Sequence, residues 1–227
     1  VGYYPNGLPG IGGPEGQNPV IISSDKAGWV EQYNKVFQSK LSFDLKLGWI
    51  TQGLALHGYG AFDFDIRNNE VFHNTWDVYN YNPATGEYDV QQGQNQDVGA
   101  TRTLQKTADQ NQRQLYHLRF NYDRSFNNHR FNGFVAYEQE VMEWETLSAY
   151  RRDLISGKKV ELFTGGPALR DNNGLSSESG RVNYFGSLSY DYMRKYLVDI
   201  TFRRDGSFNF PQGKRFGSFP GISAAWN

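Results

Sequence analysis

The feature that most constrains this chain is a two-residue alternation of side chains between residues 181 and 226. From Val182 to Tyr192, every second residue is apolar, aromatic or glycine, whereas the side chains between them are mostly polar. The run from Tyr196 to Phe202 repeats the pattern. A period of two is that of a β-strand, in which successive side chains point to opposite faces. The sequence therefore predicts strands whose two faces meet different surroundings.

Two different surroundings can be a protein core and water, or lipid and a wet lumen. Each run is about ten residues long, which is near the length of a tilted strand that crosses a bilayer. Tyrosines lie at both ends of the runs, as in the aromatic girdles of outer-membrane barrels. The link at Met193 and Arg194 is very short while other links are long, and such barrels show the same asymmetry. The pattern favours a transmembrane β-barrel.

Four further segments show the strand pattern, which, with the three strands expected between residues 181 and 226, brings the expected number of strands to about seven. The clearest is 36–47, where Leu41 shares the apolar face and Ser42 the polar face, so we expect Leu41 to face lipid and Ser42 the lumen. The short and long connections alternate, as in an antiparallel up-and-down meander. We therefore expect an all-β fold with strands at 36–47, 53–65, 114–124, 129–140, 182–192, 195–203 and 217–226.

Three segments outside these strands are expected to be irregular. Residues 1–28 are rich in glycine and proline, and we interpret them as a loop with a helical turn around residues 24–33 or, alternatively, as a disordered linker. Residues 66–111 and 141–180 are interpreted as two long external loops. They should lie on the same side of the meander, because an even number of strand crossings separates them. The expected barrel portion spans 29–227.

The composition excludes several classes of function. The formal net charge of −1 gives no general attraction to nucleic acid or to anionic lipid. The chain has no cysteine, so disulfide bonds and thiolate chemistry are excluded. No apolar run approaches the ~18 residues of a transmembrane helix, which a barrel strand does not need because only alternate residues face lipid.

A series of short motifs in the last third of the chain resembles a known family. The order is Asn-Tyr-Phe-Gly at 183–186, Tyr-Asp-Tyr at 190–192, Lys-Tyr-Leu at 195–197, Arg-Asp-Gly-Ser at 204–207, Gly-Ser-Phe-Pro at 217–220 and Ile-Ser-Ala-Ala-Trp at 222–226. This order and spacing resemble the barrel of the SusC/RagA family of TonB-linked outer-membrane nutrient transporters. Phe208 and Gly221 depart from the family pattern, at loop or strand-end positions.

The resemblance implies an architecture larger than this chain. Transporters of that kind form plugged barrels of about 22 strands, so seven strands would make an arc of the wall. The chain is then expected to be a portion of a larger protein, with the plug, the TonB-contacting segment and the remaining barrel strands absent from it. The resemblance also implies the outer membrane of a Gram-negative bacterium, outer-membrane lipid around the wall, and short links on the periplasmic side.

The activity that the resemblance implies is import and not catalysis. It implies energy supplied through TonB, a SusD-like surface lipoprotein that closes over the external loops, and a cargo of oligosaccharides or peptides. A soluble β-sandwich that binds or cleaves glycans is the alternative, since such a module also combines short strands, aromatic residues and carboxylates. Strand length and facing distinguish the two folds, because a sandwich buries one face of each sheet in a shared core.

No group of residues has the spacing of a catalytic or metal site. Residues 171–174 resemble part of a calcium loop but lack the later glutamate, and 221–225 lack the last glycine of a nucleophile elbow. Four glutamates could supply a glycosidase acid and nucleophile, although we interpret them as a wet rim: Glu138, Glu140, Glu143 and Glu145. Four histidines lack paired spacing: His57, His73, His117 and His129. We expect no catalytic residue, no cofactor and no metal.

Aromatic residues within the two expected loops are the candidates for recognition. A flat apolar ring with a polar tip can stack against a sugar ring or a peptide side chain. The alternative is that these rings pack the loops against each other. We expect the loops, together with residues 204–214 on the same rim, to contact the cargo or the lipoprotein. The candidate residues are Trp76, Tyr79, Tyr81, Trp144 and Tyr150.

Overall fold

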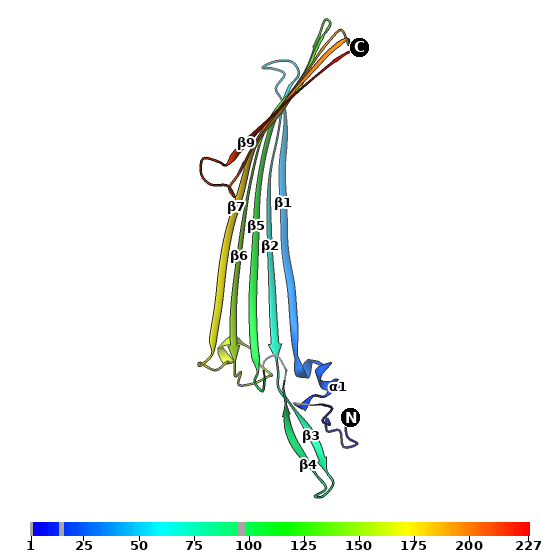
Figure 1. The fold of residues 1–227 in the computed structure, drawn as a ribbon, viewed down its shortest axis with the longest axis vertical. Coiled ribbons are helices and arrows are strands. Elements are labelled where there is room, and N and C mark those ends of the chain that lie inside the picture. Colours follow the sequence, from blue (N-terminus) through cyan, green and yellow to red (C-terminus); the bar gives the residue numbers. More distant parts are fainter. Residues whose placement is uncertain (1, 14–15, 95–98) are drawn as a thin grey trace. The chain divides into compact units, whose positions relative to one another are not determined.

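The computed structural model describes residues 2–13, 16–94 and 99–227. Seven strands form one sheet in the order β1-β2-β5-β6-β7-β8-β9, so sheet neighbours also follow each other along the chain, apart from a hairpin inserted after β2 (Figure 1). This arrangement confirms the predicted all-β meander. The strands are β1 (Gly28–Lys46), β2 (Leu54–His73), β5 (Thr103–Phe126), β6 (His129–Arg152), β7 (Arg170–Tyr192), β8 (Tyr196–Ser207) and β9 (Phe216–Trp226).

The chain divides into two compact units. The first contains Val1–Lys35, Ile66–Asp109 and Glu145–Leu175, and the second contains Val36–Asp65, Gln110–Trp144 and Ser176–Asn227. No helix in the described part of the chain is long and apolar enough to cross a membrane. The short elements are α1 (Pro19–Ile22), η2 (Asp25–Ala27), the β3 (Trp76–Asn82) and β4 (Glu87–Gly93) hairpin, and η3 (Leu162–Thr164).

The expected loop at 66–111 is wrong in its bounds. The strand β2 continues to His73, β5 begins at Thr103, and the β3–β4 hairpin forms a separate sheet between them. The alternation is lost here because polar side chains occupy both faces, yet they still pair across strands: Lys106 Nζ donates to Glu70 Oε1 over 3.0 Å. The part of this segment at 95–98 lies outside the described residues.

The expected loop at 141–180 is also shorter in the structure. The strand β6 continues to Arg152 and β7 already begins at Arg170, which leaves 153–169 as the connection. Thr146 Oγ1 donates to Asp109 Oδ1 over 2.6 Å, so polar side chains again link neighbouring strands. A strand with two polar faces keeps its backbone hydrogen bonds but has no apolar period, which is why the sequence did not reveal it.

The N-terminal segment contains a helical turn earlier than expected. The turn α1 begins at Pro19, and the Asn18 side chain caps it by accepting from the N–H groups of Val20 and Ile21. Asparagine at the cap followed by proline at the first helical position is a known start signal. Within 24–33, where a helical turn was predicted, the 3₁₀ turn η2 occupies Asp25–Ala27, and the residues from Gly28 onward belong to strand β1.

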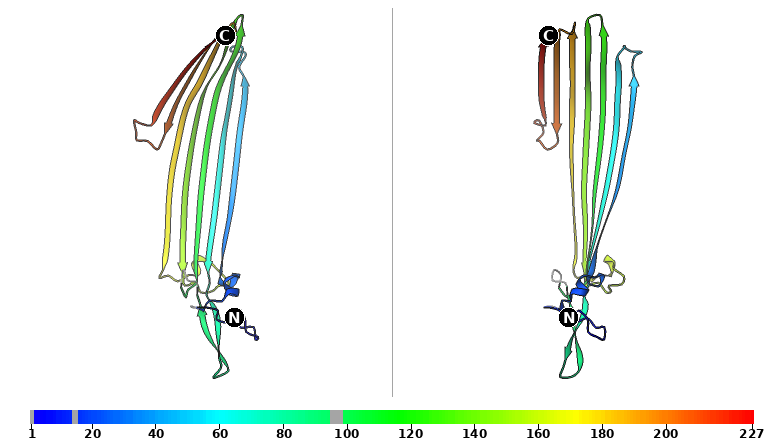
Figure 2. Two further views of the ribbon diagram at one scale, coloured as in Figure 1. Left: turned by 45° about the vertical axis from the view of Figure 1, so that its right-hand side comes forward. Right: turned by 90° about the vertical axis from the view of Figure 1, so that its right-hand side faces the viewer.

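The first unit is held by two small apolar clusters. One joins Ile21 to Trp76 and Val78 of β3, and therefore packs the N-terminal segment against the hairpin (Figure 2). The other joins Phe72 at the end of β2 to Leu104 of β5 and Leu154. Because both clusters combine residues distant in sequence, this unit depends on tertiary contacts and not on local propensity.

The strands of the second unit lie side by side in a single layer (Figure 2). One face of this layer carries the apolar side chains. Aligned residues show that neighbouring strands share this face: Leu188 pairs with Ile200, and Ile200 with Ile222. Gly58 lies under Phe43 and Leu118, so a side chain there would displace an aromatic ring. The large apolar side chains of this face are exposed: Phe37, Leu41, Phe62, Leu118, Val135, Leu188, Ile200 and Ile222.

Tight turns set the register between neighbouring strands of the second unit. Met193 and Arg194 have φ of 57° and 58°, and the N–H of Lys195 donates to the Tyr192 carbonyl over 3.0 Å. Positive φ at both central residues is typical of the type I′ turn, whose twist matches that of antiparallel strands. Next to this turn, Tyr192 pairs with Tyr196, and this register aligns the apolar residues of β7 with those of β8.

The facing of β1 can be tested by placing a cation on either face. Leu41 is 81% exposed on the apolar face. In the full-length protein, Leu41→Arg should lower the free energy of unfolding by up to about 2–4 kcal/mol, because the guanidinium would face lipid near the bilayer midplane. Ser42→Arg should have a much smaller effect. Urea titration of both variants in lipid vesicles measures the difference, and equal costs would contradict the assigned facing.

Candidate functional site

A row of alternating charges crosses four strands of the second unit. Glu140 on β6 is the centre of this row and is only 3% exposed. Its Oε1 accepts from Arg113 Nε of β5 over 2.5 Å, and Arg181 Nε of β7 lies 2.5 Å from its Oε2. Arg113 Nη1 also donates to Asp63 Oδ2 of β2 over 3.4 Å. We call Asp63, Arg113, Glu140 and Arg181 the charge row.

Aromatic rings and cations form a second row on the polar face of the same unit. The Tyr59 ring of β2 stacks on the His117 ring of β5 at 4.8 Å, and Lys40 Nζ of β1 lies 4.1 Å from the Tyr59 ring centre. The row continues through Phe185 of β7, whose ring centre is 6.2 Å from that of His117 and 5.7 Å from the guanidinium of Arg203. We call these five residues the aromatic–cation row.

The polar face therefore differs from the apolar face by its density of charge. Odd-numbered residues of β2 and β5 and even-numbered residues of β1 and β6 lie on it, as the alternation predicted. A charged side chain needs water or a polar partner, because its transfer into hydrocarbon costs several kcal/mol. The two faces of this sheet thus suit two different solvents.

The glutamates considered for acid–base chemistry are not arranged for it. Both carboxylate oxygens of Glu140 are occupied by arginines. Glu138 Oε2 lies 3.4 Å from His117 Nδ1, while Glu143 is exposed on β6. Glu145 belongs to the first unit, whereas the others belong to the second. This placement favours the interpretation of a wet polar wall.

The histidines likewise do not converge. His57 Nδ1 lies 2.7 Å from Asp44 Oδ1, and His129 Nδ1 lies 2.8 Å from the Tyr190 hydroxyl. In the described part of the chain, no group of three or more histidine, aspartate or glutamate side chains could hold a metal ion. The structure therefore offers metal chemistry no site among these residues.

Three of the five candidate recognition residues lie on strand β3 of the hairpin. Trp76 is only 8% exposed, packs against Ile21 and Val78, and donates from Nε1 to the Gly16 carbonyl over 3.1 Å. Tyr79 is half-buried, and Tyr81 is 45% exposed. Successive side chains of β3 point to opposite faces of the hairpin, so Trp76 packs inside the unit while Tyr81 faces outward.

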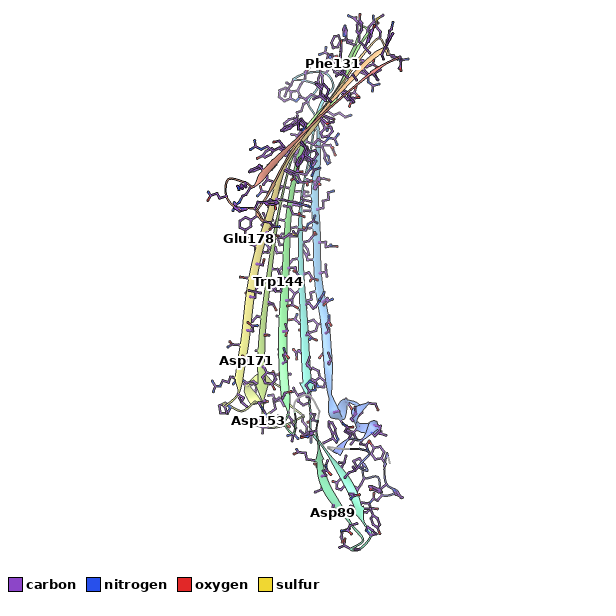
Figure 3. All side chains as sticks on the ribbon, viewed as in Figure 1. Asp89, Phe131, Trp144, Asp153, Asp171 and Glu178 are labelled. Carbon is purple, nitrogen blue, oxygen red and sulfur yellow. The ribbon has the colours of Figure 1, made fainter. Side chains whose placement is uncertain are left out.

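The other two candidates lie on strand β6 and not in a loop. Trp144, which is labelled in Figure 3, belongs to the second unit and Tyr150 belongs to the first. Both side chains are half-buried. The five residues are therefore spread over a hairpin and a long strand.

Two further tyrosines that the sequence did not single out lie near Tyr81, one on the hairpin and one in the N-terminal segment. The Tyr88 ring of β4 lies 5.2 Å from that of Tyr81, and the Tyr4 ring lies 5.0 Å from that of Tyr88. The Tyr4 hydroxyl accepts from the Tyr81 N–H over 3.2 Å. Pro83 and Gly86 are turn signals that could have revealed the hairpin and so the pairing of Tyr81 with Tyr88. No local pattern could have placed Tyr4 there. We call Tyr4, Tyr81 and Tyr88 the tyrosine cluster.

Comparison with curated proteins gives matches over about half of the chain, although no family model matches. The chain is 29% identical over 107 residues to TonB-dependent receptor P3 of Formosa agariphila, covering 47% of this chain and 11% of the receptor. It is 27% identical over 114 residues to TonB-dependent receptor SusC of Bacteroides thetaiotaomicron, covering 49% and 11%. TonB-dependent receptor P39 of Formosa agariphila is 32% identical over 116 residues, covering 47% and 10%. The matched part therefore spans about a tenth of the length of these relatives.

Solved structures extend the similarity to most of the fold. The RagAB peptide importer in its closed-closed state superposes with a TM-score of 0.65 at 16% identity, covering 86% of this chain and 20% of the RagAB chain. A further structure of the RagAB peptide transporter gives the same values. At this identity the match establishes the fold alone. The chain is thus similar to TonB-dependent receptors of the SusC/RagA type, in sequence over about half of its length and in fold over most of it.

Proposed function

We propose that this chain forms part of the wall and rim of a TonB-dependent importer in the outer membrane of a Gram-negative bacterium. The observation that carries the proposal is the two-faced sheet of the second unit, with exposed apolar side chains on one face and the charge row on the other. An exposed apolar sheet would aggregate in water, whereas lipid is a suitable solvent for it.

The polar face would line the inside of the barrel. The charge row and the aromatic–cation row require water or protein beside them, and a barrel lumen supplies both. Because the curated relatives are about ten times as long as the matched part, we propose that further strands and a plug belong to the same protein. A plugged barrel of this type has about 22 strands.

The proposed partners are TonB, which would supply energy, and a SusD-like surface lipoprotein. The relatives are named as TonB-dependent receptors, and the RagAB structures are described as a peptide importer. The cargo of the present protein is then a peptide or an oligosaccharide. The protein itself would gate the passage of this cargo and would not catalyse a reaction. Glu140, bound on both oxygens, supports the absence of a glycosidase role.

Recognition is proposed for the connections between β2 and β5 and between β6 and β7. Loops held by a rigid scaffold commonly carry binding residues. Among the candidates, exposed Tyr81 is suited to direct contact, whereas buried Trp76 holds the hairpin in place. Tyr79, Trp144 and Tyr150 are half-buried, and we propose them as supporting contacts.

A soluble β-sandwich is not supported by the architecture. A sandwich buries the inner faces of two packed sheets, whereas the apolar face of the second unit carries exposed residues such as Leu41 at 81% and Ile222 at 79%. No observation therefore favours the glycan-cleaving alternative.

Fractionation and uptake test the proposed function directly. Expressed at full length, the protein should fractionate with the outer membrane, and the cells should accumulate labelled oligosaccharides or peptides only when TonB is present. The matched control is the same strain lacking the receptor. Recovery of the protein in the soluble fraction, or uptake that is unchanged without TonB, would contradict the proposal.

The charge row should stabilise the proposed wall. Glu140→Gln should lower the free energy of unfolding by about 1.5–3 kcal/mol, because two half-exposed arginines would lose a charged hydrogen-bond partner. Glu143→Gln replaces an exposed side chain of the same strand and should lower the free energy of unfolding by less than about 0.5 kcal/mol. Urea titration of the refolded full-length protein in detergent compares them. Equal stability of the two variants would show that the row contributes nothing.

The tyrosine cluster gives a test of the recognition surface. Replacing Tyr81 and Tyr88 together by alanine should weaken cargo uptake or lipoprotein co-purification by at least about fivefold, because interface tyrosines often contribute more than 1 kcal/mol. Trp49→Ala serves as the control, since Trp49 is 82% exposed but belongs to the short link between β1 and β2. If both readouts survive while the protein still assembles in the outer membrane, the hairpin has no recognition role.

A further inference from the structure

A belt of rings crosses the apolar face of the second unit at the end where the tight turns lie. Each of the strands β5 to β9 contributes one residue, at the position where that strand begins or ends. The His129 ring centre lies 5.5 Å from that of Phe126 and 4.9 Å from that of Tyr192. Tyr192 pairs with Tyr196, and Tyr196 pairs with Trp226. We call Phe126, His129, Tyr192, Tyr196 and Trp226 the turn-side belt.

Contacts within the sheet hold the turn-side belt in place. The Met193 N–H donates to the Asn128 carbonyl over 2.8 Å, which links the β7–β8 turn to the β5–β6 turn. His129 Nδ1 lies 2.8 Å from the Tyr190 hydroxyl. The ring of Phe131, which is labelled in Figure 3, lies 4.8 Å from that of Tyr190. These contacts order the belt before any ligand arrives, which reduces the entropic cost of binding.

Two cations lie against the ends of the turn-side belt. The Arg124 guanidinium is 5.9 Å from the Phe126 ring centre. At the other end, Lys195 Nζ is 5.6 Å from the ring centre of Tyr196 and 6.0 Å from that of Trp226. In the described part of the chain, neither Arg124 nor Lys195 forms an ion pair with a carboxylate. The belt therefore carries two positive charges that are not neutralised by these residues.

The carboxylates at this end of the sheet lie on the polar face and have partners there. Asp123 precedes Arg124 on β5 and so points to the opposite face, where its Oδ2 lies 3.5 Å from Arg130 Nη2. Asp191 Oδ1 accepts from the Arg194 N–H over 2.8 Å. Every residue of the second unit is described, and the apolar-face positions nearest this end of β5 to β9 include no aspartate or glutamate. Positive charge thus dominates the apolar side of the belt.

The turn-side belt and its cations together match an anionic lipid. Rings of this kind lie at the level of the headgroups in outer-membrane barrels, and basic side chains beside a membrane bind anionic headgroups. The apolar face continues from the belt through residues such as Leu188 and Ile200, which suits acyl chains. A zwitterionic headgroup would bring an ammonium group for which this face offers no carboxylate among the described residues.

We propose that the turn-side belt binds anionic glycerophospholipid of the adjoining leaflet, with phosphates at Arg124 and Lys195 and acyl chains along the apolar face. Three strand spacings of about 4.8 Å separate the two cations, so they hold separate phosphates. The inference rests on the proposed wall function and specifies it, because it adds a lipid partner of defined charge.

Native mass spectrometry of the purified full-length receptor, released from detergent micelles, tests the assignment. The probes are phosphatidylglycerol, phosphatidylethanolamine and phosphatidylcholine with identical acyl chains, each titrated separately. Phosphatidylglycerol should bind at least about fivefold more tightly than either zwitterionic lipid, which is the contribution of about one cation near a membrane surface. Arg124→Gln and Lys195→Gln should each weaken phosphatidylglycerol binding, and the double variant should lose the preference.

Three further variants separate loss of charge from loss of folding. Arg130→Gln removes one positive charge at the same end of the sheet, but from the polar face, and should leave lipid binding unchanged. Arg124→Lys and Lys195→Arg keep the charge and should keep the preference. If Arg124→Gln fails to fold, Lys195→Gln carries the test, since Lys195 is exposed and precedes β8.

The outcomes distinguish this inference from the proposed function. Equal binding of the three lipids, a preference that survives in the double variant, or an equal loss in Arg130→Gln each overturns the lipid assignment. Displacement of phosphatidylglycerol by an equal concentration of inorganic phosphate also overturns it, because the site would then take the free ion. None of these results touches import, which is judged by TonB-dependent uptake. Uptake that is unchanged without TonB, while phosphatidylglycerol still binds through Arg124 and Lys195, would instead overturn the import function and leave the belt standing.

Discussion

Backbone hydrogen bonding between seven neighbouring strands is the constraint on which the rest of this structure depends. A strand satisfies its N–H and C=O groups only through its neighbours, and in lipid no water can replace them. Register must therefore be correct, since a slip of one residue would exchange the apolar and polar faces. Two features fix that register: the tight turn at Met193 and Arg194, and the alignment of Leu188 with Ile200 on the apolar face.

The sequence predicted the strands well where their two faces differ. Residues 36–47 alternate clearly, and β1 covers nearly all of them. Prediction failed where both faces are polar, as in the parts of β2 and β5 that hold Glu70 and Lys106. Such strands depend on backbone pairing and on ion pairs across strands, and neither leaves an apolar period. The boundaries of the predicted loops were wrong for this reason, whereas the strand order was correct.

The candidate site was less predictable than the fold, because its residues meet through tertiary contacts. Trp76 was chosen as a loop aromatic, yet the alternation of β3 turns it toward Ile21 and away from solvent. Tyr4 was missed because it lies in the segment interpreted as an irregular loop, and nothing local indicates that it meets Tyr81 and Tyr88. Arg113 and Arg181 were likewise not associated with Glu140, since register alone brings the three together.

The contacts between the N-terminal segment and the hairpin have a consequence for how such proteins diversify. The Tyr79 N–H donates to the Pro9 carbonyl and the Tyr81 N–H to the Tyr4 hydroxyl, while the Asn18 amide holds the N-terminal segment together by donating to the carbonyls of Gly2 and Gly10. A hairpin transplanted alone into a sister protein would arrive without this support and with unmatched donors. The two segments should therefore be inherited and exchanged together, although the whole of the long strand pair β1 and β2 separates them in the sequence.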